Sequence, residues 1–125
     1  RESIEILKVD RIDHGNKAMD DPELVKMIVD KQIPLTLCPL SNIALGNVKD
    51  LKHHTLKKKL DMGMLVSVNS DDPAYFGGYV NENLFAVTKA LNLNKNDIVK
   101  LAKNSFISSF LPEEKKEEYL KNIAL

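Results

Sequence analysis

The stretch Val68-Asn69-Ser70-Asp71-Asp72-Pro73 decides which fold is expected for this 125-residue chain, because it places two carboxylates just after an apolar run. An apolar run is typical of a buried strand, so these charges are expected at the mouth of a core. An ionised carboxylate there needs a partner, a proton or a metal, and two adjacent carboxylates destabilise each other's ionised form. The structural alternative is an Asp-capped turn between a strand and a helix.

The composition is that of one globular domain without an excess of either charge. Lys and Arg together number 18, as do Asp and Glu, which argues against a nucleic-acid or anionic-membrane partner. No apolar segment approaches the ~20 residues of a membrane span, and no signal peptide is visible. The lone Cys38 excludes an internal disulfide and favours a reducing, cytoplasmic location. We expect Cys38 to be a small buried residue and not a nucleophile.

Strand-like and helix-like segments alternate along most of the chain. Helix signals are an Asp20 or Asp21 cap before Pro22 and helical spacing after it. The expected strands are residues 6–13, 34–39 and 64–68, and two further helices are expected at about 50–62 and 81–91.

Polar residues follow each expected strand at a regular interval. His14, Asn42 and Asp71 lie 28 and 29 residues apart, which is close to the length of one strand-and-helix unit. The pattern therefore predicts an α/β fold with three parallel strands, and the carboxyl ends of such strands are where ligands bind. If strand geometry continued through Asp71 and Asp72, their side chains would point to opposite sides.

The remainder of the chain is expected to be helical. A stripe of Ile98, Leu101, Ala102 and Phe106 predicts one helix capped at Asn96 or nearby. A last helix is expected to start at Leu111-Pro112. No linker-like segment separates these helices from the strands, so residues 1–125 are expected to form a single unit.

Three further stretches accompany the aspartate pair in a definite order. They are Arg11-Ile12-Asp13-His14-Gly15, Cys38-Pro39-Leu40-Ser41-Asn42 and Ala102-Lys103-Asn104-Ser105-Phe106. With the aspartate stretch, this order resembles the adenosine/adenine deaminase family over nearly the whole chain. The stretch Pro73-Ala74-Tyr75-Phe76-Gly77-Gly78-Tyr79 is similar to the adenine-specific branch, and an adenosine deaminase is the alternative.

This resemblance implies a fold and a reaction. The implied fold is a TIM-type (β/α)8 barrel with one zinc ion at its C-terminal mouth. Residues 1–125 would be the C-terminal part of it, a partial domain with about three βα units plus the terminal helices. The implied reaction is hydrolysis of adenine, a purine, to hypoxanthine and ammonia by zinc-bound water, as in purine salvage.

The resemblance also implies roles for individual residues. Asp71 is the expected zinc ligand, Asp72 is expected to bind a purine ring nitrogen, and His14 is expected to act as a catalytic residue beside the zinc-bound water. Ser41 and Asn42 are expected to hold their loop. His53 and His54, in a Lys-rich segment, are expected to be solvated or to cap a helix.

The family's other zinc-site motifs do not occur in this sequence. Those motifs are an H-x-H pair, a later histidine and a glutamate three residues after it. A catalytic zinc ion needs about three protein ligands, so we expect this chain alone to be inactive. We also expect it to self-associate or to need the missing barrel segments, because three strands leave two open edges. A non-catalytic binding or assembly module is a further alternative, although such a module has no need to keep His14, Asp71 and Asp72 together.

Overall fold

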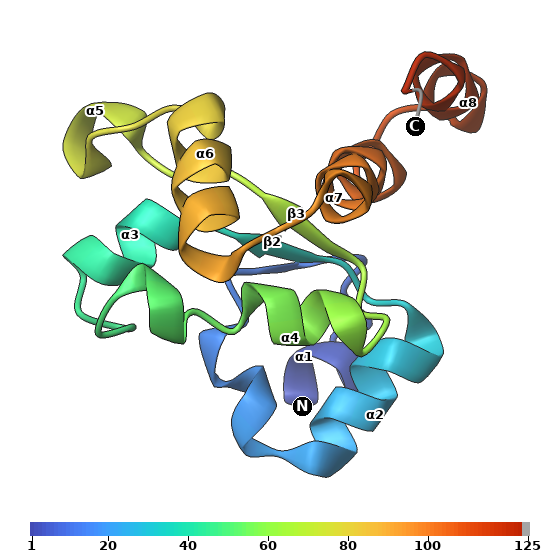
Figure 1. The fold of residues 1–125 in the computed structure, drawn as a ribbon. Coiled ribbons are helices and arrows are strands. Elements are labelled where there is room, and N and C mark those ends of the chain that lie inside the picture. Colours follow the sequence, from blue (N-terminus) through green and yellow to red (C-terminus); the bar gives the residue numbers. More distant parts are fainter. Residues whose placement is uncertain (124–125) are drawn as a thin grey trace.

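A three-stranded parallel sheet forms the centre of the computed structural model, which describes residues 1–123 (Figure 1). The strands stand in the order β1 (Ile12–Asp13), β2 (Leu35–Leu37) and β3 (Val66–Val68). Leu35 of β2 is the partner of Ile12 on one side and of Val66 on the other. The α/β class and the parallel strands expected from the sequence are confirmed.

Helices connect the strands and cover the sheet. In Figure 1, α7 runs beside β3, and α8 lies farther from the sheet. Among the described residues, no helix is both long enough and apolar enough to cross a membrane. The helices are α1 (Glu2–Glu5), α2 (Pro22–Lys31), α3 (Pro39–Ala44), α4 (Leu56–Asp61), α5 (Pro73–Phe76), α6 (Val80–Leu91), α7 (Lys95–Ile107) and α8 (Glu113–Lys121), with 3-10 turns η1 (Asn16–Asp20) and η2 (Leu51–His53).

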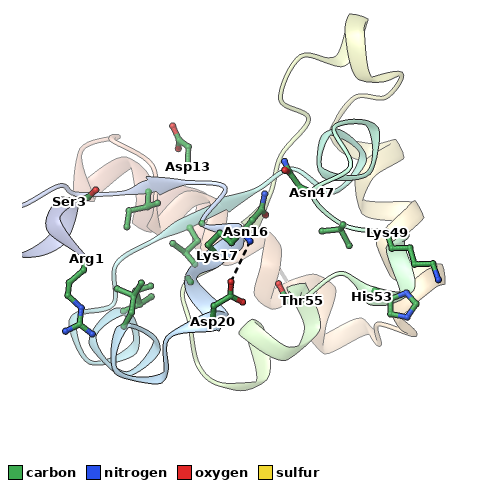
Figure 2. Close-up of a pocket in the computed structure, with 17 residues that line it drawn as sticks. Arg1, Ser3, Asp13, Asn16, Lys17, Asp20, Asn47, Lys49, His53 and Thr55 are labelled. Atoms are coloured by element: carbon green, nitrogen blue, oxygen red, sulfur yellow. Dashed lines mark ion pairs between the residues drawn. The ribbon is translucent and has the colours of Figure 1, made fainter.

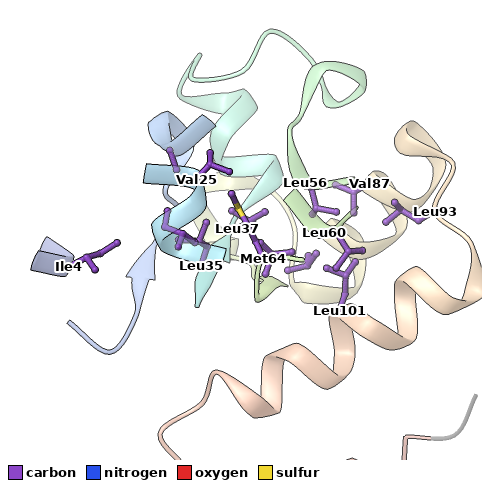
Figure 3. Packing of buried hydrophobic residues seen from close by; sticks show 14 residues of the cluster. Ile4, Val25, Leu35, Leu37, Leu56, Leu60, Met64, Val87, Leu93 and Leu101 are labelled. Atoms are coloured by element: carbon purple, nitrogen blue, oxygen red, sulfur yellow. The ribbon is translucent and has the colours of Figure 1, made fainter. Parts of the chain in front are cut away.

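The core lies between the sheet and the helices around it (Figure 3). All three residues of β3 are buried, as expected for a strand covered on both faces. Asn104 of α7 donates a hydrogen bond from Nδ2 to the Val66 carbonyl at 2.8 Å, so a helix side chain satisfies part of the outer edge of β3. The fully buried apolar side chains include Ile28, Leu35, Leu37, Leu56, Leu60, Met64, Val66 and Val87.

The first expected strand is much shorter than its apolar pattern predicted. Within residues 6–13 only Ile12–Asp13 pair with β2, and residues 6–11 form no strand. Ile6 and Leu7 are 70% and 71% exposed, and Lys8 has a positive φ of 56° that breaks an extended backbone.

The helix expected over residues 50–62 is also wrong as a continuous element. Asp50 accepts a hydrogen bond from the His53 amide and caps the short turn η2. His54 then has an extended ψ of 132°, so α4 begins only at Leu56. The helix is interrupted because two side chains accept hydrogen bonds from nearby backbone amides: Asp50 from the His53 amide and His54 from the Leu56 amide.

Other helix boundaries agree with the sequence more closely. Asp21 caps α2 through the amides of Glu23 and Leu24, with Pro22 in the first turn. The cap of α7 is Asn94 and not Asn96, because Asn94 and Asp97 form a reciprocal capping box. The helix α6 begins one residue earlier than expected.

Candidate functional site

His14 lies at the carboxyl end of β1, in a turn of unusual backbone geometry. Its amide donates to the Thr36 carbonyl of β2 at 2.9 Å, and its φ is 65°. Gly15 follows with a φ of 63°, and a Cβ there would lie 3.1 Å from Leu35. Two consecutive left-handed residues turn the chain away from the sheet. The second position favours glycine because of its positive φ and because Leu35 leaves little room for a Cβ.

A buried lysine forms a hydrogen bond with the backbone of the same turn. Lys59 of α4 is fully buried, and its Nζ donates to the Gly15 carbonyl at 3.0 Å. Burial lowers the pKa of Lys59 to about 8. The turn after β1 is therefore tied to the helix that precedes β3.

Asp71 lies three residues beyond the end of β3, also with a left-handed backbone (φ 58°). The strand geometry does not continue through Asp71 and Asp72, so the premise for placing them on opposite faces is wrong. The Ser41 hydroxyl donates to Asp71 Oδ2 at 2.6 Å. Ser41 belongs to α3, the helix that follows β2, and it is fully buried. Its hydroxyl therefore fixes the Asp71 carboxylate from a different part of the sheet edge.

The turns after the strands bring His14 and Asp71 together. His14 Nε2 lies 3.7 Å from Asp71 Oδ2, and one ligand atom from each of these residues and from Cys38 lies within 4.8 Å of the others. They face a hollow of about 380 Å³. Its lining also includes Arg11, Asp13, Thr36, Asn69, Ser70 and Val80.

The donor set partly fits a zinc ion. Imidazole nitrogen and carboxylate oxygen are both ordinary zinc ligands. Burial, together with the negative charges of Asp71 and Asp13, raises the pKa of the Cys38 thiol to about 11, so this thiol is protonated at neutral pH. Cys38 is buried, as expected, and its raised pKa disfavours the thiolate that acts as a nucleophile. His14 and Asp71 fit a metal by type, but they fall short of the three ligands that a catalytic zinc needs.

Asp72 is not brought into this hollow. Its Oδ1 accepts a hydrogen bond from the Tyr75 amide at 3.1 Å and caps α5, and Asp72 does not line the hollow around His14 and Asp71. The capped turn that the sequence left open as an alternative is thus present at Asp72. The purine-binding role of Asp72 stays a prediction.

A second, larger hollow, of about 740 Å³, is lined by residues that include Asp13, Asn16 and Thr55 (Figure 2). The charged residues labelled around it include Lys17, which pairs with Asp20 at 3.9 Å, and Lys49. Gly15 lines this hollow, but neither His14 nor Asp71 does. This larger hollow is therefore not the one that contains His14 and Asp71, although Asp13 lines both.

The two adjacent histidines differ sharply in environment. His53 is exposed as expected. His54 is only 5% exposed, so its expected solvation is wrong, whereas the helix-capping alternative agrees with its contact to the first amide of α4. Its Nε2 lies 3.0 Å from Asn42 Oδ1, and its Nδ1 accepts the Leu56 amide at 3.1 Å. Burial, helped by the charge of Lys59, lowers the pKa of His54 to about 4.

This low pKa predicts a loss of stability in acid. Between the unfolded pKa of 6.5 and the folded pKa of about 4, the unfolded chain binds a proton that the folded chain does not. The free energy of unfolding should therefore fall by about 2 kcal/mol between pH 7 and pH 5. Urea unfolding at both pH values measures this loss, and His54→Gln should remove it while His53→Gln should not. An equal pH dependence in all three proteins would contradict the assignment.

Comparison with known proteins adds the family. The model of the adenosine deaminase family matches residues 1–125. The chain belongs to the adenosine deaminase family. Adenine deaminases of Chlorobium phaeobacteroides and Acinetobacter baylyi are 54% and 47% identical to it over 95% and 98% of the chain. The chain spans 36% and 37% of the length of these two relatives.

Solved structures place this member of the adenosine deaminase family in a known fold. The adenine deaminase of Arthrobacter aurescens matches 98% of the chain with a TM-score of 0.95 and 44% identity, and the chain covers 37% of it. A zinc-bound amidohydrolase of Burkholderia ambifaria, 21% identical, shares the fold with a TM-score of 0.87 over 98% of the chain and 34% of its own. The resemblance predicted from the sequence is confirmed.

The motifs that carried this resemblance meet at one edge of the sheet, with one exception. His14, Ser41 and Asp71 come from three different motifs and lie in contact or close to it. Asn104, from the fourth motif, lies at the β3 edge instead. The sequence did not predict the burial of His54. The adjacent histidines His53 and His54 were the only feature of the sequence that drew attention to this position.

Proposed function

We propose that this chain supplies part of the active site of a zinc-dependent adenine deaminase that converts adenine to hypoxanthine and ammonia, a purine-salvage reaction. The observation that carries the proposal is the contact set around Asp71, which Ser41 holds at 2.6 Å and which faces His14 at 3.7 Å. Relatives named adenine deaminase, at 47–54% identity, support the substrate. The single free Cys38 supports a cytoplasmic location.

Each residue has a separate role in this proposal. Asp71 would hold a zinc ion through its carboxylate, and a bound ion would supply an activated water near neutral pH. His14 lines the same hollow, so its Nε2 would orient a water there and hold a proton during attack on the base. Asp72 binds a ring nitrogen of adenine through the oxygen that does not cap α5.

The rest of the zinc site comes from outside these 125 residues. The relatives are nearly three times as long as the matched part, and this sequence has no H-x-H pair. The described part also leaves large apolar side chains exposed, and β1 pairs on one side only. We propose that a preceding barrel segment covers these surfaces, and that the isolated chain self-associates through them. The exposed side chains include Ile6, Leu7, Phe85 and Phe110.

The test compares the isolated chain with a joined protein. The joined protein is this chain fused behind the part of the Arthrobacter aurescens adenine deaminase that lies outside the match. We expect the isolated chain to show no adenine turnover with zinc, because it offers too few ligands. The joined protein should bind one zinc ion and release ammonia from adenine. Turnover by the isolated chain at an ordinary enzyme rate contradicts the incomplete site, and a folded, zinc-loaded joined protein without turnover contradicts the function.

Adenosine is the second candidate substrate, since the matching family model is named for adenosine deaminase. The segment that would border a ribose carries two exposed tyrosines, Tyr75 and Tyr79. Assays of the joined protein with adenine and with adenosine separate the two. A higher kcat/KM for adenosine would overturn the choice of adenine.

A further inference from the structure

The adjacent histidines His53 and His54 have entirely different surroundings. His53 is exposed and binds the carboxylate of Asp50 through Nδ1 at 2.7 Å. His54 is buried, and both of its ring nitrogens have partners inside the protein. A buried imidazole with two fixed partners is held in one orientation and one tautomer.

The backbone of α4 fixes the tautomer of His54. The Leu56 amide donates to Nδ1 at 3.1 Å, so this nitrogen is the acceptor and the ring proton lies on Nε2. Nε2 therefore donates to Asn42 Oδ1 at 3.0 Å. The side chain of Asn42 is fully buried, and within the described residues its Nδ2 has no hydrogen-bond partner. Among the described residues, His54 is thus the one side chain that forms a hydrogen bond with the side-chain amide of Asn42.

Asn42 directly follows Ser41 in α3. Ser41 is also fully buried, and its hydroxyl reaches Asp71 Oδ2 at 2.6 Å. The start of α3 has a second anchor, because Asn83 of α6 accepts the Leu40 amide at 3.0 Å. His54 and Asn83 therefore hold this short helix from two sides, and its position sets where the Ser41 hydroxyl meets the carboxylate.

We infer that His54 is a positioning residue for Asp71, which it orients through Asn42 and Ser41. The inference rests on the proposed zinc-binding role of Asp71. A group that orients a metal ligand changes metal affinity, typically by about 10–100-fold when it is removed. Asp72 caps a different helix, α5, so loss of His54 should leave purine affinity largely unchanged.

The test uses His54→Leu in the joined protein, with His53→Leu as the matched control on the neighbouring exposed residue. We expect the zinc dissociation constant, measured by competition with a chelator, to rise about tenfold in His54→Leu. The kcat for adenine should fall by a similar factor while KM stays near its original value. His54→Gln keeps an amide donor that can reach Asn42, so it should recover most of the zinc affinity. His53→Leu should behave like the original protein.

A double-substitution series shows whether the effect passes through Ser41. In a Ser41→Ala background, His54→Gln and His54→Leu should change zinc affinity very little further, because the link to Asp71 is already broken. If His54→Leu does not fold, His54→Asn takes its place in both backgrounds, because its amide oxygen can still accept the Leu56 amide while its shorter side chain has no group at the position of Nε2. Fully additive effects would overturn the inference.

The outcomes separate the inference from the function on which it rests. A lower thermal midpoint for His54→Leu with unchanged zinc affinity and unchanged kcat reduces His54 to a packing role and overturns the inference. If the unsubstituted joined protein folds but neither binds zinc nor turns over adenine, the proposed function fails, and the inference fails with it. Zinc binding and turnover by the unsubstituted joined protein, together with weaker zinc binding in His54→Leu but not in His53→Leu, support both.

Discussion

Asp71→Asn in the joined protein is expected to remove bound zinc and to lower kcat/KM for adenine about a thousandfold, or about 4 kcal/mol of transition-state stabilisation. Asparagine is the informative replacement because Asp71 has a left-handed φ of 58°, which asparagine adopts more readily than alanine. The amide oxygen of the new side chain could still accept the Ser41 hydroxyl, which lies 2.6 Å from the carboxylate in the original protein. The substitution therefore removes the charge and leaves the local structure intact.

Metal content after dialysis and steady-state kinetics with adenine measure this effect. Asp61→Asn is the matched control, because Asp61 is an exposed helix residue paired with Lys57 on the surface. Such a pair contributes little, so zinc content and turnover should stay unchanged in that variant. Full zinc occupancy in Asp71→Asn would contradict the assignment of Asp71 as the metal ligand.

The arrangement of the strands was predictable because it depends on local signals. Apolar runs that end in polar residues recur at intervals of 28 and 29 residues, and β2 and β3 lie inside the predicted runs. The run over residues 6–13 misled because Ile6 and Leu7 are apolar but exposed. Pairing with β2 begins only at Ile12, and nothing in the local pattern marks that start.

The polar interior was much harder to predict. Lys59 and His54 lie in a segment rich in lysine, whose composition favours a solvated helix. Their burial depends on partners far away in the sequence, the Gly15 carbonyl for Lys59 and the Asn42 amide for His54. A hydrogen bond between distant segments leaves no periodic signal, so composition alone assigns both residues to the surface.

The geometry of the aspartate pair shows the same limit. Residue types predicted a carboxylate close to a histidine, and the structure places Asp71 beside His14. The left-handed turn at Asp71 and the cap formed by Asp72 depend on backbone angles, which the sequence pattern did not reveal. The side chains of the two adjacent residues diverge because Asp71 lies in a left-handed turn and Asp72 caps a helix. They do not diverge through the alternation of a strand.

This separation makes Asp72→Asn the test of the second role. We expect KM for adenine to rise about 10–100-fold in the joined protein, because a hydrogen bond to a charged group contributes about 1.5–3 kcal/mol. Zinc content should stay the same, since Asp72 does not line the hollow that contains His14 and Asp71. Steady-state kinetics and metal analysis of the same preparation measure both quantities.

The cap at α5 makes this substitution unusually clean. Asp72 accepts the Tyr75 amide at 3.1 Å, and asparagine caps a helix about as well as aspartate. The fold of α5 should therefore survive in Asp72→Asn, so a higher KM reports on the purine contact. Asp72→Ser keeps a capping hydroxyl on a shorter side chain, and it should raise KM at least as much. Equal zinc loss in Asp71→Asn and Asp72→Asn would show that the pair acts as one metal-binding unit, and an unchanged KM in both Asp72 variants would leave Asp72 with the cap alone.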